Sequence, residues 1–193
     1  MVVVLFMKQE VVITSGNLNQ APMGAFLSDN NVLLHVFEGS HTYENLKVDK
    51  FYILNICSPY LVAKAVLDDD FDSEFLNLDG KKIPYLKDAY KILLIEVTGR
   101  KFVEYKNIYG KSKLMVVNGI NISESVLNDD YSPYSRAEGA LVEMAVIYSR
   151  LGILNGTKKQ EAYLNMKIFM EIVKKVGSTK HLELGRRFLT AKL

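Results

Sequence analysis

Cysteine and histidine are scarce in this chain, with one cysteine and three histidines among 193 residues. The single cysteine, Cys57, excludes an internal disulfide and suits a reducing cytoplasm. It stands in the apolar run 51–57 with no histidine nearby to activate it, so we interpret it as a small buried hydrophobic residue. The histidines His35, His41 and His181 are scattered without ligand spacing, which argues against a metal site.

A strong net charge and a long apolar run are also missing. The formal net charge is +2, and the basic residues come in short, separate pairs such as Lys81-Lys82 and Arg186-Arg187. This pattern argues against nucleic-acid binding. The apolar stretch Met1 to Phe6 is too short to span a membrane and lacks the features of a signal peptide. We therefore expect a strand there, and a cytoplasmic protein with no membrane partner.

Two further motifs are absent. No Gly-x-Gly-x-x-Gly segment follows an expected strand, which argues against a Rossmann domain. The acidic segment 68–74 lacks the glycine and the terminal glutamate of a calcium loop, so a solvated loop is favoured over a cation site.

Short β-branched or alternating segments fill the first two thirds of the chain. They predict strands within residues 2–14, 21–37, 51–57, 89–98, 101–106 and 113–120. The second of these ranges holds two strands with a tight turn between them, and Gly99-Arg100 is expected to separate two others. Because short turns join most of these strands, we predict an antiparallel barrel rather than a parallel βαβ sheet.

Helical periodicity takes over after residue 121. Capping boxes fit Ser135–Glu138 and Thr157–Gln160, and helices are expected at 135–151, 157–177 and 182–191. A further helix is expected at 59–67. The fold class is therefore mainly β with α, with a barrel domain over residues 1–122 and a helical subdomain over residues 123–193.

The segment 39–45 carries the best candidate for a binding site. Gly39 can adopt backbone angles closed to other residues, and Ser40 and Thr42 offer hydroxyls. A short helix is expected from residue 43 to 47. Free N–H groups at the start of such a helix, beside two hydroxyls, form an anion site that suits a phosphate.

Other interpretations of the same segment remain open. Ser40 and Thr42 are also residues that commonly do no more than cap a helix. His41 either contacts the phosphate or faces solvent, and Asn45 is placed to reach back to it from the first turn.

These motifs resemble those of a known family. Ala21-Pro22-Met23-Gly24, then residues 38–46 and Asn55-Ile56, are similar to an uncharacterised archaeal family of FMN-binding split-barrel proteins. The likeness extends more weakly to the helix with Arg136, Glu138-Gly139-Ala140, Glu143 and Arg150. This family is distantly related to flavin reductases and pyridoxamine phosphate oxidases. The resemblance implies a split β-barrel of the FMN-binding type, a homodimer, and FMN bound near the dimer interface.

The resemblance also implies which residues bind the cofactor: Met23, Gly24, Gly39, Ser40, His41, Thr42, Asn45 and Asn55. The phosphate would lie on the segment 39–45, the flavin ring against Met23 and Gly24, and Asn55 beside the ring or the ribityl chain. From the residues alone, Pro22 and Gly24 could simply kink a strand, and Asn55 could bridge backbone groups.

We therefore expect an FMN-binding flavoprotein and an oxidoreductase of the flavin reductase type, with NAD(P)H or another small molecule as redox partner. No side chain stands out as a catalytic acid or base. The alternatives are a non-catalytic flavin-binding protein and a dimerisation module, and a deazaflavin could replace FMN. Glu143 and Arg150 share a helix face and are either a ligand-facing pair or surface charges.

Overall fold

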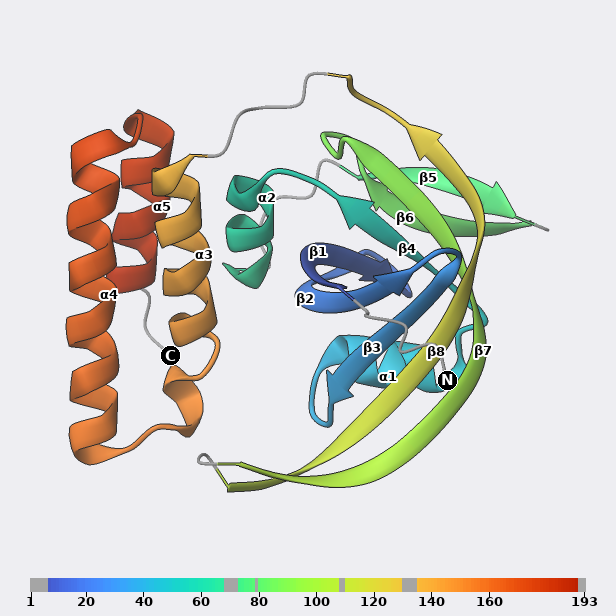
Figure 1. Cartoon of the computed structure of the whole chain (residues 1–193), viewed down its shortest axis with the longest axis horizontal. Coiled ribbons are helices and arrows are strands. Elements are labelled where there is room, and N and C mark those ends of the chain that lie inside the picture. Colours follow the sequence, from blue (N-terminus) through green and yellow to red (C-terminus); the bar gives the residue numbers. More distant parts are fainter. Residues whose placement is uncertain (1–6, 68–72, 79, 108–109, 130–134, 191–193) are drawn as a thin grey trace. The chain divides into compact units, whose positions relative to one another are not determined.

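The computed structural model describes residues 7–67, 73–78, 80–107, 110–129 and 135–190. Strands fill most of its first two thirds, and helices form the rest (Figure 1). The strand expected at Met1 to Phe6 and the acidic residues 68–72 lie outside the described residues. The elements, in chain order, are β1 (Met7–Ser15), β2 (Asn19–Ser28), β3 (Asn31–Phe37), α1 (His41–Val48), β4 (Phe51–Ile56), α2 (Pro59–Lys64), β5 (Ser73–Leu78), β6 (Lys81–Leu86), β7 (Lys91–Asn107), β8 (Gly110–Val126), α3 (Arg136–Tyr148), α4 (Gly156–Val176) and α5 (Thr179–Thr190), with short 3-10 turns at Ala65–Leu67 and Leu151–Ile153.

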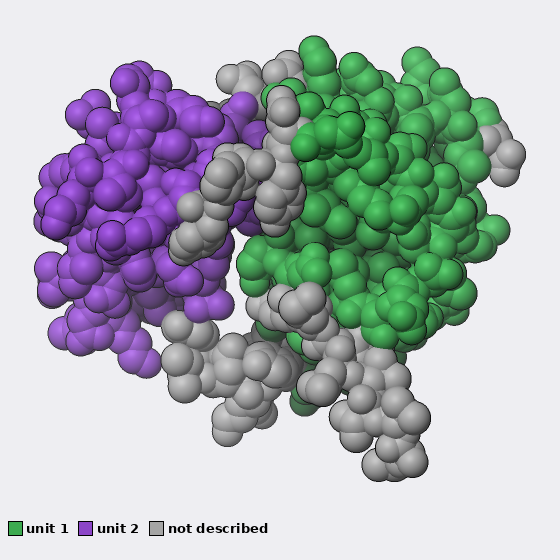
Figure 2. Space-filling model, turned by 45° about the horizontal axis from the view of Figure 1, so that its top comes forward, with its two compact units in different colours: residues 1–57, 68–131 green, residues 58–67, 132–193 purple. Residues whose placement is uncertain are grey.

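Two compact units divide the chain (Figure 2). One consists of residues 1–57 and 68–131 and holds the described strands with α1. The other consists of residues 58–67 and 132–193 and holds α2, α3, α4 and α5. Helix α2 thus belongs with the C-terminal helices, whereas the predicted domain 1–122 includes it. The domain boundary at residue 122 stays a prediction.

Six strands close a barrel in the order β1-β2-β3-β8-β7-β4, and each described pairing is antiparallel. The predicted antiparallel barrel is confirmed. In β3, Val32, Leu34 and Val36 are buried while His35 and Phe37 are exposed. This alternation points the aliphatic side chains into the core and His35 outward, as its place between apolar residues predicts.

Helix α1 packs on β1, β2 and β3. Its buried residues Tyr43 and Leu46 belong to the same apolar core as the strands. An eight-residue helix is marginal in water on its own, so this packing is what holds α1 in place.

Strands β7 and β8 are 17 residues long each and form a curved pair (Figure 1). The expected break at Gly99-Arg100 is wrong, because β7 runs through it as one strand. The pairing with β8 shifts register between Val97 and Gly99 instead. A bulge bends a strand without ending it, and glycine is common at such sites, so local sequence resembles that of a turn.

A separate two-stranded sheet, β5–β6, replaces the loop expected after the acidic segment. No residue of β5 is buried: Glu74, Phe75 and Asn77 are exposed and the other three are half-buried. Its apolar residues, Phe75, Leu76 and Leu78, do not alternate regularly with polar ones, so the segment lacks the pattern that predicts a strand. Gly80 has φ of +80° and lies between the two strands.

The helical unit buries an apolar core of its own. Helix α3 begins as predicted, with the Ser135 Oγ accepting the N–H of Glu138. The capping box expected at Thr157–Gln160 is wrong, because α4 begins at Gly156, and α5 begins at Thr179 rather than Leu182. The core residues are Ala63, Ala140, Leu141, Met144, Ala145, Leu151, Ala162, Met166, Met170, Val173, Leu184 and Phe188. No helix within the described ranges is long and apolar enough to cross a membrane.

A buried polar contact joins the first turns of α3 and α5. His181 Nε2 lies 3.6 Å from Glu138 Oε1, and both residues are buried. His181 Nδ1 accepts the backbone N–H of Ser178 at 2.9 Å. Because a backbone N–H can only donate, Nδ1 is the acceptor there, and Nε2 is the ring nitrogen that faces Glu138. His181 therefore serves the packing of these helices.

Candidate functional site

The predicted phosphate site includes the residues that connect β3 to α1. Gly39 has φ of +91°, is exposed, and has no atom within 4 Å of the position that a Cβ would take. The backbone angle, and not a lack of space, favours glycine here. His41 opens α1 and is exposed.

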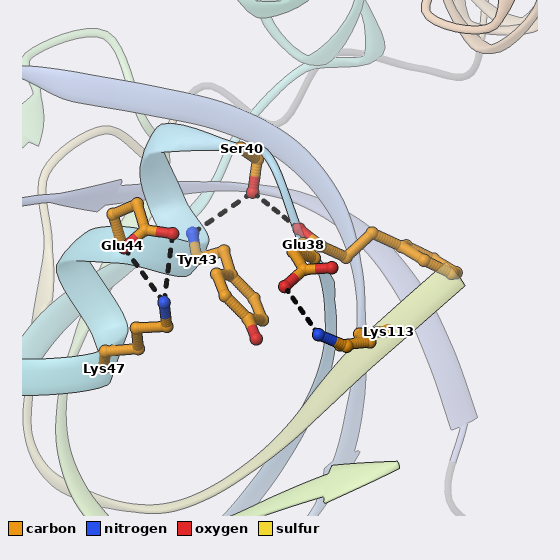
Figure 3. A network of polar contacts seen from close by, with 7 residues as sticks. Glu38, Ser40, Tyr43, Glu44, Lys47 and Lys113 are labelled. Atoms are coloured by element: carbon orange, nitrogen blue, oxygen red, sulfur yellow. Dashed lines mark hydrogen bonds and ion pairs between the residues drawn. The ribbon is translucent and has the colours of Figure 1, made fainter. Parts of the chain in front are cut away.

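Ser40 is the N-cap of α1, with its hydroxyl over the first turn (Figure 3). Its Oγ accepts the N–H of Tyr43 at 3.1 Å and donates to the carbonyl of Phe37 at 3.1 Å. The capping role left open by the sequence is thus present. To donate to a phosphate, the Ser40 hydroxyl would have to leave the Phe37 carbonyl.

Two ion pairs flank this turn, as Figure 3 shows. Lys47 Nζ lies 3.1 Å from Glu44 Oε2, and Lys113 Nζ lies 3.6 Å from Glu38 Oε1. The hydrogen bond to Glu44 raises the pKa of Lys47. These two lysines are therefore already paired with acidic side chains. In the first turn of α1, Ser40 accepts the N–H groups of Tyr43 and Glu44, so the backbone N–H groups of His41 and Thr42 are the ones that face an incoming anion.

Thr42 and Asn45 face the turn between β1 and β2. The Thr42 Oγ1 accepts the Asn19 Nδ2 at 2.9 Å, and the Asn45 Nδ2 donates to the Ser15 Oγ at 3.2 Å. The Asn19 Nδ2 also donates to the Ser15 Oγ, at 3.1 Å. A Cβ at Gly16 would lie 2.5 Å from the Asn45 Nδ2, so turn and helix are in close contact.

The other end of α1 is held by β7. Arg100 Nε donates to the carbonyl of Leu46 at 2.5 Å, and Arg100 Nη2 donates to the carbonyl of Asp49 at 2.6 Å. A guanidinium on the last carbonyls satisfies acceptors that the helix leaves open and complements its negative end.

Asn55 is fully buried in β4, on the barrel wall. Its Nδ2 donates to the Val12 carbonyl at 2.9 Å and to the Thr14 Oγ1 at 3.1 Å. Its Oδ1 accepts the N–H of Leu86 at 2.8 Å. The backbone-bridging role is therefore present, and a flavin would have to compete with three protein bonds. The flavin-side role of Asn55 stays a prediction.

Met23 and Gly24 lie further along β2, opposite Val11 and Glu10 of β1. Both are half-buried, and Met23 packs against the barrel core. The expected contact of these two residues with a flavin ring stays a prediction.

Family models match the chain at residues 9–147 and at residues 135–188. They are described as the N-terminal domain of a protein of unknown function (DUF447) and as a protein of unknown function (DUF447). The first match alone covers more than half of the chain. The chain belongs to the DUF447 family. The resemblance predicted from the sequence is confirmed at the level of the family.

Two of the proteins that this chain is similar to match nearly its whole length. The uncharacterized protein MJ1453 of Methanocaldococcus jannaschii is 40% identical over 190 residues, covering 95% of this chain and 97% of that protein. The crystal structure of FMN-bound protein MM1853 from Methanosarcina mazei superposes with a TM-score of 0.76 at 21% identity, covering 96% of this chain and 95% of that one. A flavoredoxin from Methanosarcina acetivorans matches more weakly, with a TM-score of 0.48 at 13% identity, covering 68% and 75%.

Three other predicted positions of this DUF447 protein can be placed. Glu143 lies on α3 and Arg150 just after it, and both are exposed. Whether Glu143 and Arg150 form a ligand-facing pair or are separate surface charges stays open. Cys57 is buried, as the sequence predicts, and burial raises the pKa of its thiol to about 12.

Three residues that hold α1 were not among the predicted site residues: Ser15, Asn19 and Arg100. Ser15 and Asn19 belong to no motif in the sequence, and they flank the turn between β1 and β2. Local patterns carry no information about which helix such a turn contacts, so only the fold could reveal them.

Proposed function

We propose that this DUF447 protein binds FMN, with the FMN phosphate at the start of α1. The observation that carries the proposal is its likeness, over 96% of the chain, to the FMN-bound protein MM1853 of the same family. The site geometry supports the same assignment, because α1 presents its N-terminus beside Gly39, Ser40 and Thr42. A dianionic phosphate is favoured at such a terminus.

The chain would hold FMN through several groups. First-turn N–H groups and the Thr42 hydroxyl would bind the phosphate oxygens by charge-assisted hydrogen bonds. His41, exposed at the first position of α1, would meet the phosphate from the solvent side. Met23 and Gly24 would line the ring. Ser40 and Asn45 would mainly fix the helix that presents these groups.

Bound FMN would supply hydride or electron transfer, and the protein would bind and orient it. We propose an oxidoreductase of the flavin reductase type, supplied by NAD(P)H or another small reductant and working as a homodimer. The lone buried cysteine suits a reducing cytoplasm. Non-catalytic flavin binding by the same fold is the alternative.

Absorption spectroscopy of the purified protein tests the cofactor. We expect a flavin spectrum, from the protein as isolated or after added FMN, and a mass for the released compound equal to that of FMN. A mass equal to that of a deazaflavin would identify that analogue, and not FMN, as the cofactor. Colourless protein that takes up no FMN would contradict flavin binding and leave a dimerisation module.

Anaerobic addition of NAD(P)H tests the reaction. Bleaching of the flavin, followed by recovery of colour with an electron acceptor, is the result expected of an oxidoreductase. Flavin that stays oxidised after NAD(P)H or another small reductant is added would favour the non-catalytic alternative.

A further inference from the structure

Resting on the proposed function, we infer that Asn19 is a positioning residue that aims the Thr42 hydroxyl at the FMN phosphate. Asn19 opens β2, at the end of the turn that follows β1, and Thr42 is the second residue of α1. The two are far apart in sequence, yet the Asn19 Nδ2 lies 2.9 Å from the Thr42 Oγ1.

The direction of this hydrogen bond decides where the Thr42 proton points. A hydroxyl has one proton to donate and two lone pairs that accept. Because the Asn19 N–H occupies a lone pair of Thr42, the proton of Thr42 must point away from Asn19. Among the described residues, no acceptor for that proton is within hydrogen-bond reach, although Thr42 is 1% exposed.

The hydroxyl of Ser15, at the end of β1, is also an acceptor of hydrogen bonds from neighbouring amides. Its Oγ accepts from Asn19 at 3.1 Å and from Asn45 at 3.2 Å, so both of its lone pairs are filled, and it is fully buried. In the part of the chain that the structure describes, its proton also has no acceptor. Both hydroxyls are thus hydrogen-bonded as acceptors, and each keeps one proton that an added acceptor could take.

A phosphate oxygen is the acceptor that the proposed function supplies. It carries negative charge, so it bonds strongly to hydroxyl donors and gains from the adjacent end of α1. The side-chain amide of Asn19 donates a hydrogen bond to each of the two hydroxyls and would set their direction before the cofactor arrives. Such preorganisation lowers the cost of binding.

Titration of the apoprotein with FMN and with riboflavin, which lacks the phosphate, separates this role from general stability. We expect Asn19→Ala to weaken FMN binding by about tenfold, because the Thr42 hydroxyl is then no longer held in the direction of its hydrogen bond to the charged phosphate, and to leave riboflavin binding unchanged. Asn17→Ala, an exposed asparagine in the same turn, is the matched control and should change neither.

Thr42→Val provides a second route to the same answer, because valine keeps the shape of threonine without its hydroxyl. It should cause the same selective loss of FMN affinity, and Asn19→Ala added to it should cost little more, since both act through one proton. If Asn19→Ala fails to fold, Asn19→Leu, which keeps the approximate size of the side chain and removes its N–H donor, takes its place in both comparisons.

The outcomes separate the two proposals. Wild-type protein that binds no flavin would contradict the proposed function. Wild-type protein that binds FMN, with variants that lose FMN and riboflavin equally or lose neither, would overturn the role of Asn19 alone. Independent, additive losses in the double variant would also overturn it.

Discussion

Asn55 illustrates how much one buried amide can hold together. It makes three hydrogen bonds, to β1 through Val12 and Thr14 and to β6 through Leu86. Thr14 adds a bond of 2.6 Å to the carbonyl of Pro84. The β5–β6 sheet is thereby tied to the barrel by two polar side chains within an apolar wall.

Asn55→Ala should lower the free energy of unfolding by about 3 kcal/mol, because the Leu86 N–H and the Val12 carbonyl lose their partner in a buried place. Urea unfolding measures this, and hydrogen exchange should show faster exchange of the Leu86 amide. Asn118→Ala, on an exposed position of β8, is the control and should change stability by less than about 0.5 kcal/mol. Equal effects of the two substitutions would contradict the bridging role.

At the residue scale, the sequence predicts that a residue such as Asn55 forms hydrogen bonds better than it predicts which residues it bonds to. Asn55 was singled out because an amide in an apolar run must find a hydrogen bond, and it does. Its partners come from β1 and β6, and pairings so distant in sequence leave no local signal. The same holds for Thr42, whose partner Asn19 lies in another element.

At the scale of elements, α1 is held at both ends. Ser40 and the β1–β2 turn fix its first turn, and Arg100 binds its last carbonyls. The helix is short, so these contacts and the burial of Tyr43 and Leu46 decide where its N-terminus points.

Arg100→Met should therefore destabilise the barrel unit by about 2 kcal/mol, the loss of hydrogen bonds from a charged donor. Chemical denaturation measures the change, and amide exchange should report faster opening of α1. Lys101→Met, at the exposed neighbouring position, should have little effect. An unchanged exchange rate in α1 for Arg100→Met would show that Arg100 does not hold the helix.

Elements with strong periodicity were predictable, and those shaped by tertiary contacts were not. The alternation in β3 and the proline-led start of α2 are local signals. Strand β5 is exposed and depends on anchors elsewhere in the barrel unit, and the bulge near Gly99 is a property of the β7–β8 pairing.

At the scale of the whole molecule, a closed barrel and a helical unit each have a separate apolar core. The first family match reaches from the barrel into α3, and the second covers α3 to α5, so both units belong to the DUF447 architecture. The proposed phosphate site lies within the barrel unit, on α1 and the turn beside it. The proposal can therefore be tested without reference to how the units are arranged.

The crystal structure of the protein with FMN tests the central claim most directly. The account predicts phosphate oxygens within hydrogen-bond distance of the first-turn N–H groups of α1 and of the Thr42 Oγ1. FMN bound elsewhere on the chain, or a phosphate that leaves the start of α1 untouched, would contradict it.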